Sequence, residues 1–205
     1  MSTSRLEAFS DGVIAVAITL LVLNIAVPAP PLSEGHTLAG ELGRNWPVYA
    51  AYVTSFLTIG IIWINHHVMI SRLREADRTI LFLNLLLLMS IAALPFATSL
   101  MAAYLKQSSG QHLAAAIYSG AFLVMALFFA TLNRHILLVK AHLLEEQLPV
   151  EHRRRILFRS ITGVVPYAIA TALALVSSYV TLAICTALAI FYALPIASGG
   201  DMPAD

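Results

Sequence analysis

The sequence has few charged residues. Asp, Glu, Lys and Arg make up 11% of its 205 residues, against roughly 25% in soluble domains. Hydrophobic residues make up 59%, so lipid is the expected solvent. A single cysteine, Cys185, excludes an internal disulfide and a multi-cysteine metal site. Because no polar or Pro/Ser-rich stretch is long enough to be a linker, one domain over residues 1–205 is expected.

Apolar stretches long enough to cross a bilayer recur along the chain, since about 20 apolar residues span the hydrocarbon core as a helix. Residues 160–200 contain no charged residue, and one helix of that length would reach about 60 Å, twice the core thickness. We therefore predict a turn at Ser177-Ser178. Pro95 and Pro166 are each expected to kink a span. The sequence predicts an all-α, polytopic membrane protein with six transmembrane helices, over residues 6–27, 46–70, 80–105, 113–139, 160–177 and 179–197.

Basic residues lie mostly on one side of this topology. One side receives ten Lys and Arg residues, and the other receives only Arg44 and Lys106. This bias predicts that both termini face the cytoplasm. Asp11 interrupts the N-terminal apolar segment, so we interpret that segment as a retained span and not a cleaved signal. The arginine triplet at 153–155 is interpreted as a topology anchor that meets anionic lipid, and not as a nucleic-acid site.

The predicted spans contain few ionisable side chains. No acidic residue lies near a predicted midplane, which argues against a pump or a proton-coupled transporter. The filter sequence Thr-Val-Gly-Tyr-Gly of ordinary potassium channels is missing, so an ion path would need another construction. No nucleophile–base pair, metal cluster or phosphate loop supports an enzyme. Ser10 and Asp11 lack the nucleophile elbow of a hydrolase.

Two polar clusters remain, at the cytoplasmic ends of the first and second spans. They comprise Arg5, Glu7, Ser10, Asp11, Trp63, Asn65, His66 and His67. Trp63, His66 and His67 share one helical face at the depth of the first cluster. We predict an inter-helix network that holds the two spans together, and a gating or proton-sensing role for the histidines stays open. Metal binding is not expected, because adjacent histidines diverge on a helix and no third ligand is present.

Residues 5–23, RLEAFSDGVIAVAITLLVL, are distinctive. They resemble the first helix of the transmembrane protein 175 family, the potassium channels of lysosomes and their prokaryotic relatives. The shared pattern is Arg-x-x-x-Phe-Ser-Asp followed by an apolar helix that contains Thr-Leu-Leu. Residues 63–67, WINHH, resemble that family's second helix. The resemblance covers nearly the whole chain and implies a single-repeat prokaryotic member in the inner cell membrane.

The resemblance implies a homotetramer in which the first helix of each subunit lines a central pore. It places the apolar constriction at Val16, where the family usually has isoleucine or leucine. Thr19 would lie beside the filter, with further apolar rings at Leu20 and Leu23. Valine is shorter than isoleucine, so a slightly wider constriction is expected. The resemblance also implies a structural network that supports the pore helix, comprising Arg5, Phe9, Ser10, Asp11, Trp63, Asn65, His66 and His67.

The residues themselves permit this interpretation. Val16, Leu20 and Leu23 are spaced i, i+4 and i+7 on one helical stripe, and rings of such residues can gate by dewetting. A stripe of this kind is by itself more often a packing or lipid-facing surface. The hypothesis is a potassium-permeable cation channel with potassium in the pore and no cofactor. Its expected partners are its own copies, membrane lipid and monovalent cations, and no nucleic acid is expected to bind. A proton leak channel of the same architecture and a non-conducting membrane scaffold are the alternatives.

Overall fold

The apolar runs of the sequence fold as helices, which satisfy backbone hydrogen bonds within one segment as a bilayer requires. The computed structural model describes residues 3–29, 37–145 and 148–194. Its α-helices are α1 (Thr3–Leu20), α2 (Leu38–Arg44), α3 (Trp46–Ser71), α4 (Arg78–Ala92), α5 (Leu94–Tyr104), α6 (Gln111–Arg134), α7 (Val150–Thr162), α8 (Val164–Leu173) and α9 (Ser178–Ala193). Short 3₁₀ segments form η1 (Leu21–Asn24) and η3 (Ala141–Leu143), and η2 (His135–Val139) is a π-helix.

Within the part of the chain that the structure describes, five helical stretches are long and apolar enough to cross a membrane, namely Thr3–Asn24, Trp46–Ser71, Arg78–Tyr104, Gln111–Val139 and Val150–Leu173. They overlap the first five predicted spans. The fifth stretch begins at Val150 and not at residue 160, because the basic segment before the apolar run continues the same helix. The sixth predicted span, 179–197, corresponds to α9, which has 16 residues. Residues 195–197 of that prediction lie outside the described residues.

Turns and breaks fall where the sequence has capping residues or proline. The Asp77 side chain accepts a hydrogen bond from the backbone N–H of Ile80 at 2.9 Å and so caps α4. Ser177 caps α9 in the same way. The predicted turn at Ser177-Ser178 is found slightly earlier, over residues 174–177, and Ser178 is the first residue of α9. Pro95 stands in the first turn of α5, and Pro166 lies in the first turn of α8. Both prolines therefore mark the predicted interruptions of their spans.

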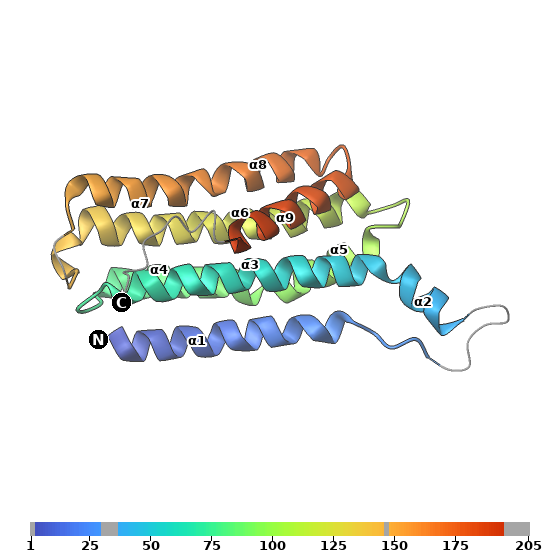
Figure 1. The fold of residues 1–205 in the computed structure, drawn as a ribbon, viewed down its shortest axis with the longest axis horizontal. Coiled ribbons are helices and arrows are strands. Elements are labelled where there is room, and N and C mark those ends of the chain that lie inside the picture. The colour runs from blue at the N-terminus through green and yellow to red at the C-terminus, as the bar shows by residue number, and fades with distance from the viewer. Residues whose placement is uncertain (1–2, 30–36, 146–147, 195–205) are drawn as a thin grey trace.

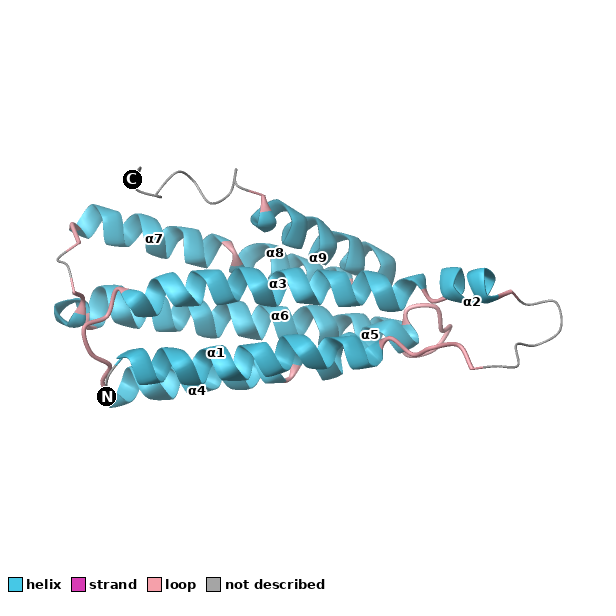
Figure 2. Cartoon of the chain, turned by 60° about the horizontal axis from the view of Figure 1, so that its bottom comes forward, coloured by secondary structure: helices cyan, strands magenta, loops and turns pink. Residues whose placement is uncertain are grey.

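The helices form one elongated bundle (Figures 1 and 2). Helix α6 lies at its centre and contacts α4, α5, α7, α8 and α9. The largest buried side chains of α6, Tyr118, Phe122 and Met125, fill the middle of the core. Helix α1 lies along one edge and contacts α3, α4 and α5. The N-terminal helix is therefore a peripheral element of the single chain.

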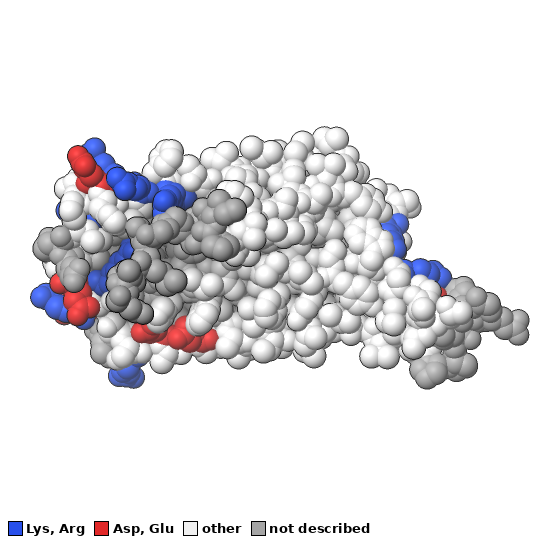
Figure 3. All heavy atoms as spheres, in the orientation of Figure 1, with Lys and Arg blue, Asp and Glu red and all other residues white. Residues whose placement is uncertain are grey.

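Charged side chains gather at the two ends of the bundle (Figure 3). The end with the start of α1, the α3–α4 turn and α7 carries most of the Lys and Arg, and a broad uncharged belt separates it from the opposite end. Arg44 and Lys106 lie at that opposite end, where the Lys106 ammonium donates to the Arg44 carbonyl at 2.6 Å. This distribution is that of a multi-pass membrane protein.

A buried group of hydroxyls joins α3 to three other helices inside the bundle. The Ser55 hydroxyl lies 2.8 Å from that of Thr98 on α5 and 3.1 Å from that of Tyr118 on α6. On the adjacent residue, the Thr54 hydroxyl lies 2.7 Å from that of Thr186 on α9. Such bonds hold membrane helices together in the absence of a hydrophobic driving force between them. Helix α3 is therefore fixed in rotation relative to the core.

A clasp at the cation-rich end joins the α3–α4 turn to the connection after α6. An isolated antiparallel bridge pairs Leu73 with Leu144, and the Lys140 ammonium lies 3.0 Å from the Asp77 carboxylate. The backbone hydrogen bond from Ile80, followed by the contact with Lys140, lowers the pKa of Asp77 below its usual 3.8. The clasp therefore depends on the ionised carboxylate.

Candidate ion pathway and its polar support

Helix α1 has two distinct faces. The face that packs on the bundle comprises Leu6, Ser10, Ile14, Ala17 and Leu21, all of them buried. A second face contains the predicted constriction residues, and Val16, Leu20 and Leu23 are 57%, 42% and 74% exposed. Because η1 is a 3₁₀ segment, with three residues per turn, Leu23 lies one turn beyond Leu20 on the same side and the stripe continues. The predicted pore residues therefore lie on a face that the chain itself leaves uncovered.

Thr19 lies on the uncovered side of α1 as well. Its hydroxyl donates to the carbonyls of Ala15 and Val16, at 3.0 and 2.9 Å. This bond occupies the hydroxyl hydrogen and leaves the oxygen lone pairs of Thr19 directed away from the helix backbone. An exposed acceptor thus stands within one turn of Val16. Phe9, from the same predicted group, is 51% exposed.

Two side-chain bonds join α1 to α3 at their cation-rich ends. The Trp63 indole N–H donates to the Asp11 carboxylate at 2.8 Å. One turn nearer the end of the bundle, His67 Nδ1 lies 2.6 Å from the Glu7 carboxylate. Trp63 and His67 also contact each other, with ring centroids 6.4 Å apart. The two carboxylates of α1 are thus each held by a side-chain ring of α3, one by an indole and the other by an imidazole.

A second, fully buried chain of hydrogen bonds joins α1, α3 and α4. The Asn84 amide donates to the Ser10 hydroxyl at 3.0 Å, and Ser10 donates to the Leu6 carbonyl at 2.8 Å. Asn84 Oδ1 lies 2.7 Å from His66 Nε2. Because Oδ1 can only accept, Nε2 carries the hydrogen. His66 Nδ1 has no hydrogen-bond partner among the described residues. Sequence reasoning missed Asn84, although an amide within an apolar run is itself a signal of inter-helix bonding.

The far end of α1 is fixed separately. The Asn24 amide donates to the Pro95 carbonyl at 3.3 Å, and the Ser99 hydroxyl donates to Asn24 Oδ1. Sequence reasoning also missed this contact between η1 and α5. Since polar bonds hold both ends of the buried side of α1, its other face has a defined orientation.

Two members of the predicted network lie outside these bonds. Arg5 is exposed and forms no hydrogen bond or ion pair with the residues that the structure describes. Asn65 donates to the Ile61 carbonyl of its own helix at 2.8 Å. Within the described ranges, no group of three His, Cys, Asp or Glu side chains could hold a metal ion. The site therefore consists of an apolar face and its polar support.

Fold and site together define an all-α, multi-pass membrane protein whose N-terminal helix keeps one apolar face open. The family model of the endosomal/lysosomal potassium channel TMEM175 matches residues 5–95. A potassium channel of Streptomyces collinus is 44% identical over 190 residues, which cover 93% of this chain and 91% of that one. The chain therefore belongs to the TMEM175 family, a family of ion channels and not of enzymes. The resemblance seen in residues 5–23 and 63–67 is confirmed.

Two further relatives extend the comparison. The crystal structure of a lysosomal potassium-selective channel TMEM175 homolog from Chamaesiphon minutus superposes with a TM-score of 0.83 at 37% identity, over 94% of this chain and 97% of that one. The mouse endosomal/lysosomal proton channel TMEM175 is 38% identical over 113 residues, which are 52% of this chain and 23% of the mouse protein. The family match over residues 5–95 contains every residue of the α1–α3–α4 polar bonds.

Proposed function

We propose that this chain is a potassium-permeable channel in which four copies surround a central pore lined by α1. The observation that carries the proposal is the uncovered stripe of Val16, Leu20 and Leu23 on a helix whose opposite side is fixed by buried polar bonds. The potassium channel of Streptomyces collinus and the potassium-selective homolog of Chamaesiphon minutus support the choice of ion. Both termini face the cytoplasm of a bacterial inner membrane, with α9 as the sixth crossing.

In this proposal, rings of apolar side chains control the flow of ions. Four copies of Val16 form the narrowest ring, and Leu20 and Leu23 add rings above it. An apolar constriction excludes water when it is narrow, and it conducts when it widens enough to hydrate. The Thr19 oxygen lies next to the first ring and offers an acceptor to a partly dehydrated cation. The polar bonds to α3 and α4 fix the rotation of α1, which keeps these side chains directed at the axis.

The experiment measures flux from liposomes that hold the purified protein, with potassium, sodium and proton gradients compared. Val16→Asn and Leu20→Asn hydrate the constriction, so they are expected to raise flux and to reduce the preference for potassium. Val22→Asn is the matched control, because Val22 is 48% exposed and lies on another side of η1, the 3₁₀ segment that continues α1. Unchanged flux in the first two variants, or an equal rise in the control, would refute a pore at this stripe.

A proton leak is the second candidate, and two observations favour it. The mouse relative is named a proton channel, and buried His66 keeps one ring nitrogen free of any described partner. Histidine can carry protons near neutral pH. In the same liposomes, proton flux that exceeds potassium flux and is lost in His66→Gln would select this candidate. Potassium flux that persists in that variant selects the potassium channel.

A further inference from the structure

The arginines of α7 divide between two sides of the helix. Arg153 lies against the end of α6, where its guanidinium donates to the Leu137 carbonyl of η2 at 3.3 Å and its Nε atom is buried. Arg154, Arg155 and Arg159 are exposed instead. With 3.6 residues per turn, these three positions fall on one side of the helix, away from Arg153. This side is the outer face of α7.

The outer face of α7 carries positive charge that the chain leaves unpaired. Within the described ranges, the side chains of Arg154, Arg155 and Arg159 form no ion pair and no hydrogen bond. Glu151 is exposed one turn before Arg155, and it is the acidic residue of this helix. Figure 3 shows blue side chains gathered over α7, at the upper left. Three guanidinium groups against one carboxylate leave donors for a phosphate, which arginine binds through paired N–H groups.

An apolar track continues from these arginines toward the middle of the membrane. Helices α7 and α8 form one helical stretch, Val150–Leu173. Exposed apolar side chains repeat along it at i, i+3, i+7 and i+11, which is one face of a helix, namely Phe158, Ile161, Val165 and Ile169. The rise from Phe158 to Ile169 is about 16 Å at 1.5 Å per residue, close to half of the hydrocarbon core of about 30 Å. The track therefore has the length of one leaflet.

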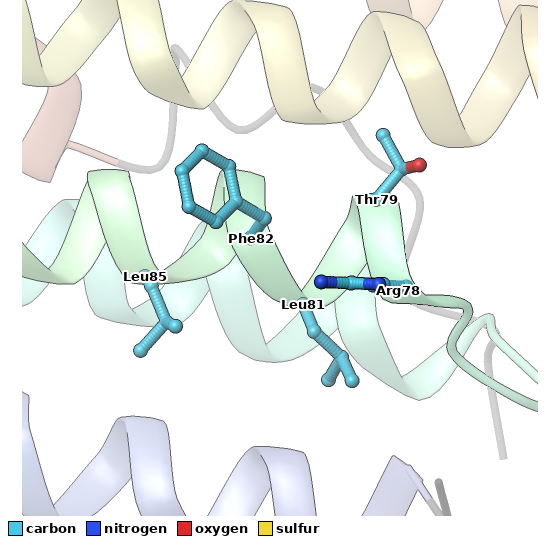
Figure 4. Close-up of a pocket in the computed structure, with 5 residues that line it drawn as sticks. All are labelled: Arg78, Thr79, Leu81, Phe82 and Leu85. Atoms are coloured by element: carbon cyan, nitrogen blue, oxygen red, sulfur yellow. The ribbon is translucent and has the colours of Figure 1, made fainter.

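The position of α7 in the bundle leaves this face to lipid. Helix α7 lies at the edge opposite α1 (Figures 1 and 2), so a ring of subunits around α1 keeps α7 on the outside. Arg78, at the start of α4, is a contrasting case. It borders a hollow lined by Thr79, Leu81, Phe82 and Leu85 (Figure 4), but α4 packs against α1, where neighbouring subunits of that ring would lie. The hollow also has one guanidinium where the outer face of α7 has three.

We propose that the outer face of α7 binds one anionic phospholipid of the leaflet at the cation-rich end of the bundle. Arg155 and Arg159 lie one turn apart, and helical side chains lean toward the N-terminus, so both guanidinium groups reach the headgroup phosphate. Arg154 approaches the headgroup from the other side of Phe158, and an acyl chain follows the apolar track. Anionic headgroups attract basic residues beside a membrane span. The inference goes beyond the proposed function, because it holds whichever ion the pore conducts.

The bound lipid has a structural consequence for α7. Among the residues Val150–Thr162 of this helix, none is fully buried. On the inner side, α7 is held by the Arg153 bond to Leu137 and by the bond between Asn133 and Ser160, at 2.6 Å. A lipid on the outer face holds the same helix from the opposite side. The neighbouring arginines of the triplet therefore have different tasks, one toward the protein and two toward the membrane.

The test titrates the purified, delipidated protein with phosphatidylglycerol or with phosphatidylcholine and counts the bound lipids by native mass spectrometry. The native chain is expected to bind phosphatidylglycerol more tightly. Each arginine beside an anionic headgroup contributes about fivefold in affinity, so Arg155→Gln/Arg159→Gln is expected to bind phosphatidylglycerol about 25-fold more weakly, and each single variant about fivefold. The control Arg72→Gln/Arg74→Gln removes two charges from the α3–α4 turn at the same end of the bundle and is expected to keep the native affinity.

A second pair of variants tests the apolar track. Phe158 is 69% exposed, and Phe158→Ala is expected to weaken both lipids by a similar factor, because it removes contact with the acyl chain and not with the headgroup. Phe191→Ala is the matched control, since Phe191 is an exposed phenylalanine on α9. It is expected to leave the binding of both lipids unchanged. Native binding of both lipids by Phe158→Ala would overturn the track.

Four results would overturn the lipid site. The first is equal binding of the two lipids by the native chain. The second is an equal loss in Arg72→Gln/Arg74→Gln, which would mean a diffuse attraction to the charged end. The third is full displacement of the lipid by glycerophosphoglycerol, the same headgroup without acyl chains, which would mean a site for soluble phosphates. The fourth is a smaller oligomer in Arg155→Gln/Arg159→Gln, which would mean that a second copy covers this face. None of them changes the potassium flux of the native chain, which tests the proposed function separately.

Discussion

The buried bond between Asn84 and His66 allows the contribution of the polar support to be measured. In Asn84→Leu, a side chain of similar size replaces the amide, and His66 Nε2–H loses its acceptor. His66 Nδ1 already has no described partner, so the whole imidazole is left without hydrogen bonds inside the bundle. Ser10 loses the hydrogen bond that it accepts from Asn84 but keeps the one that it donates to the Leu6 carbonyl, so it contributes less to the destabilisation than His66 does. A buried donor without a partner costs about 1–3 kcal/mol, which is the expected destabilisation.

Removing both partners tests whether the histidine is the cause. The double variant His66→Phe/Asn84→Leu has no unsatisfied imidazole, and replacing both partners with apolar groups is nearly neutral. It is therefore expected to recover most of the stability that Asn84→Leu loses. Thermal unfolding in mild detergent measures the single and double variants together, as a double-mutant cycle.

Asn133→Leu is the matched control for this cycle. Asn133 is also buried, and its amide donates to the Ser160 hydroxyl at 2.6 Å, away from His66. The stability that Asn133→Leu loses is expected to be the same whether or not the chain also carries His66→Phe. If Asn84→Leu is as stable as the parent chain, or if His66→Phe adds a further loss to it, the buried network does not hold α1 in place.

Three further results are expected from the same contacts. Trp63→Phe removes the donor to Asp11 and is expected to lower the free energy of unfolding by roughly 1 kcal/mol, measured by thermal unfolding. Trp46→Phe is the matched control, because Trp46 does not bond to Asp11. Any stability that Trp46→Phe loses should therefore be the same with or without the Asp11 carboxylate. Ser99→Ala removes the donor to Asn24 and is expected to loosen the far end of α1, so that hydrogen exchange rises in 21–25; unchanged exchange there would contradict that anchor. The pKa of Asp77 is lowered in the folded chain, so its stabilisation is present above the unfolded value and is lost as pH falls through the folded value. Thermal unfolding at neutral and at acidic pH is expected to show an advantage over Asp77→Asn only at the higher pH, and an advantage that persists in acid would refute the clasp.

The helical segments could be predicted because burial in lipid requires long apolar helices whatever their neighbours are. The uncharged run from 160 to 200 had to fold back, and the structure places the turn over residues 174–177, immediately before the start of α9 at Ser178. The basic residues before that run were not predicted to be helical, because a membrane span is recognised by its apolar residues and this one was therefore taken to begin after the last arginine. The helix continues through them and reaches back to Val150.

Partners across helices were harder to predict. The tryptophan at 63 and the histidines at 66 and 67 could be placed on one face from their spacing, and two of them do bond to α1. Asn84 and Asn24 each stand alone in an apolar run, so spacing gives them no partner. Their bonds depend on the rotation of α4 and α5, which packing determines and a single helical period does not. Arg5 has no bond to this network among the described residues, so its place in the network stays a prediction.

The most direct test of the central claim is a density map of the protein in a lipid nanodisc with potassium. The account predicts a four-fold ring with α1 innermost and with Val16, Leu20 and Leu23 directed at the axis. A map that places these three side chains against lipid, or that places another helix at the axis, would contradict it.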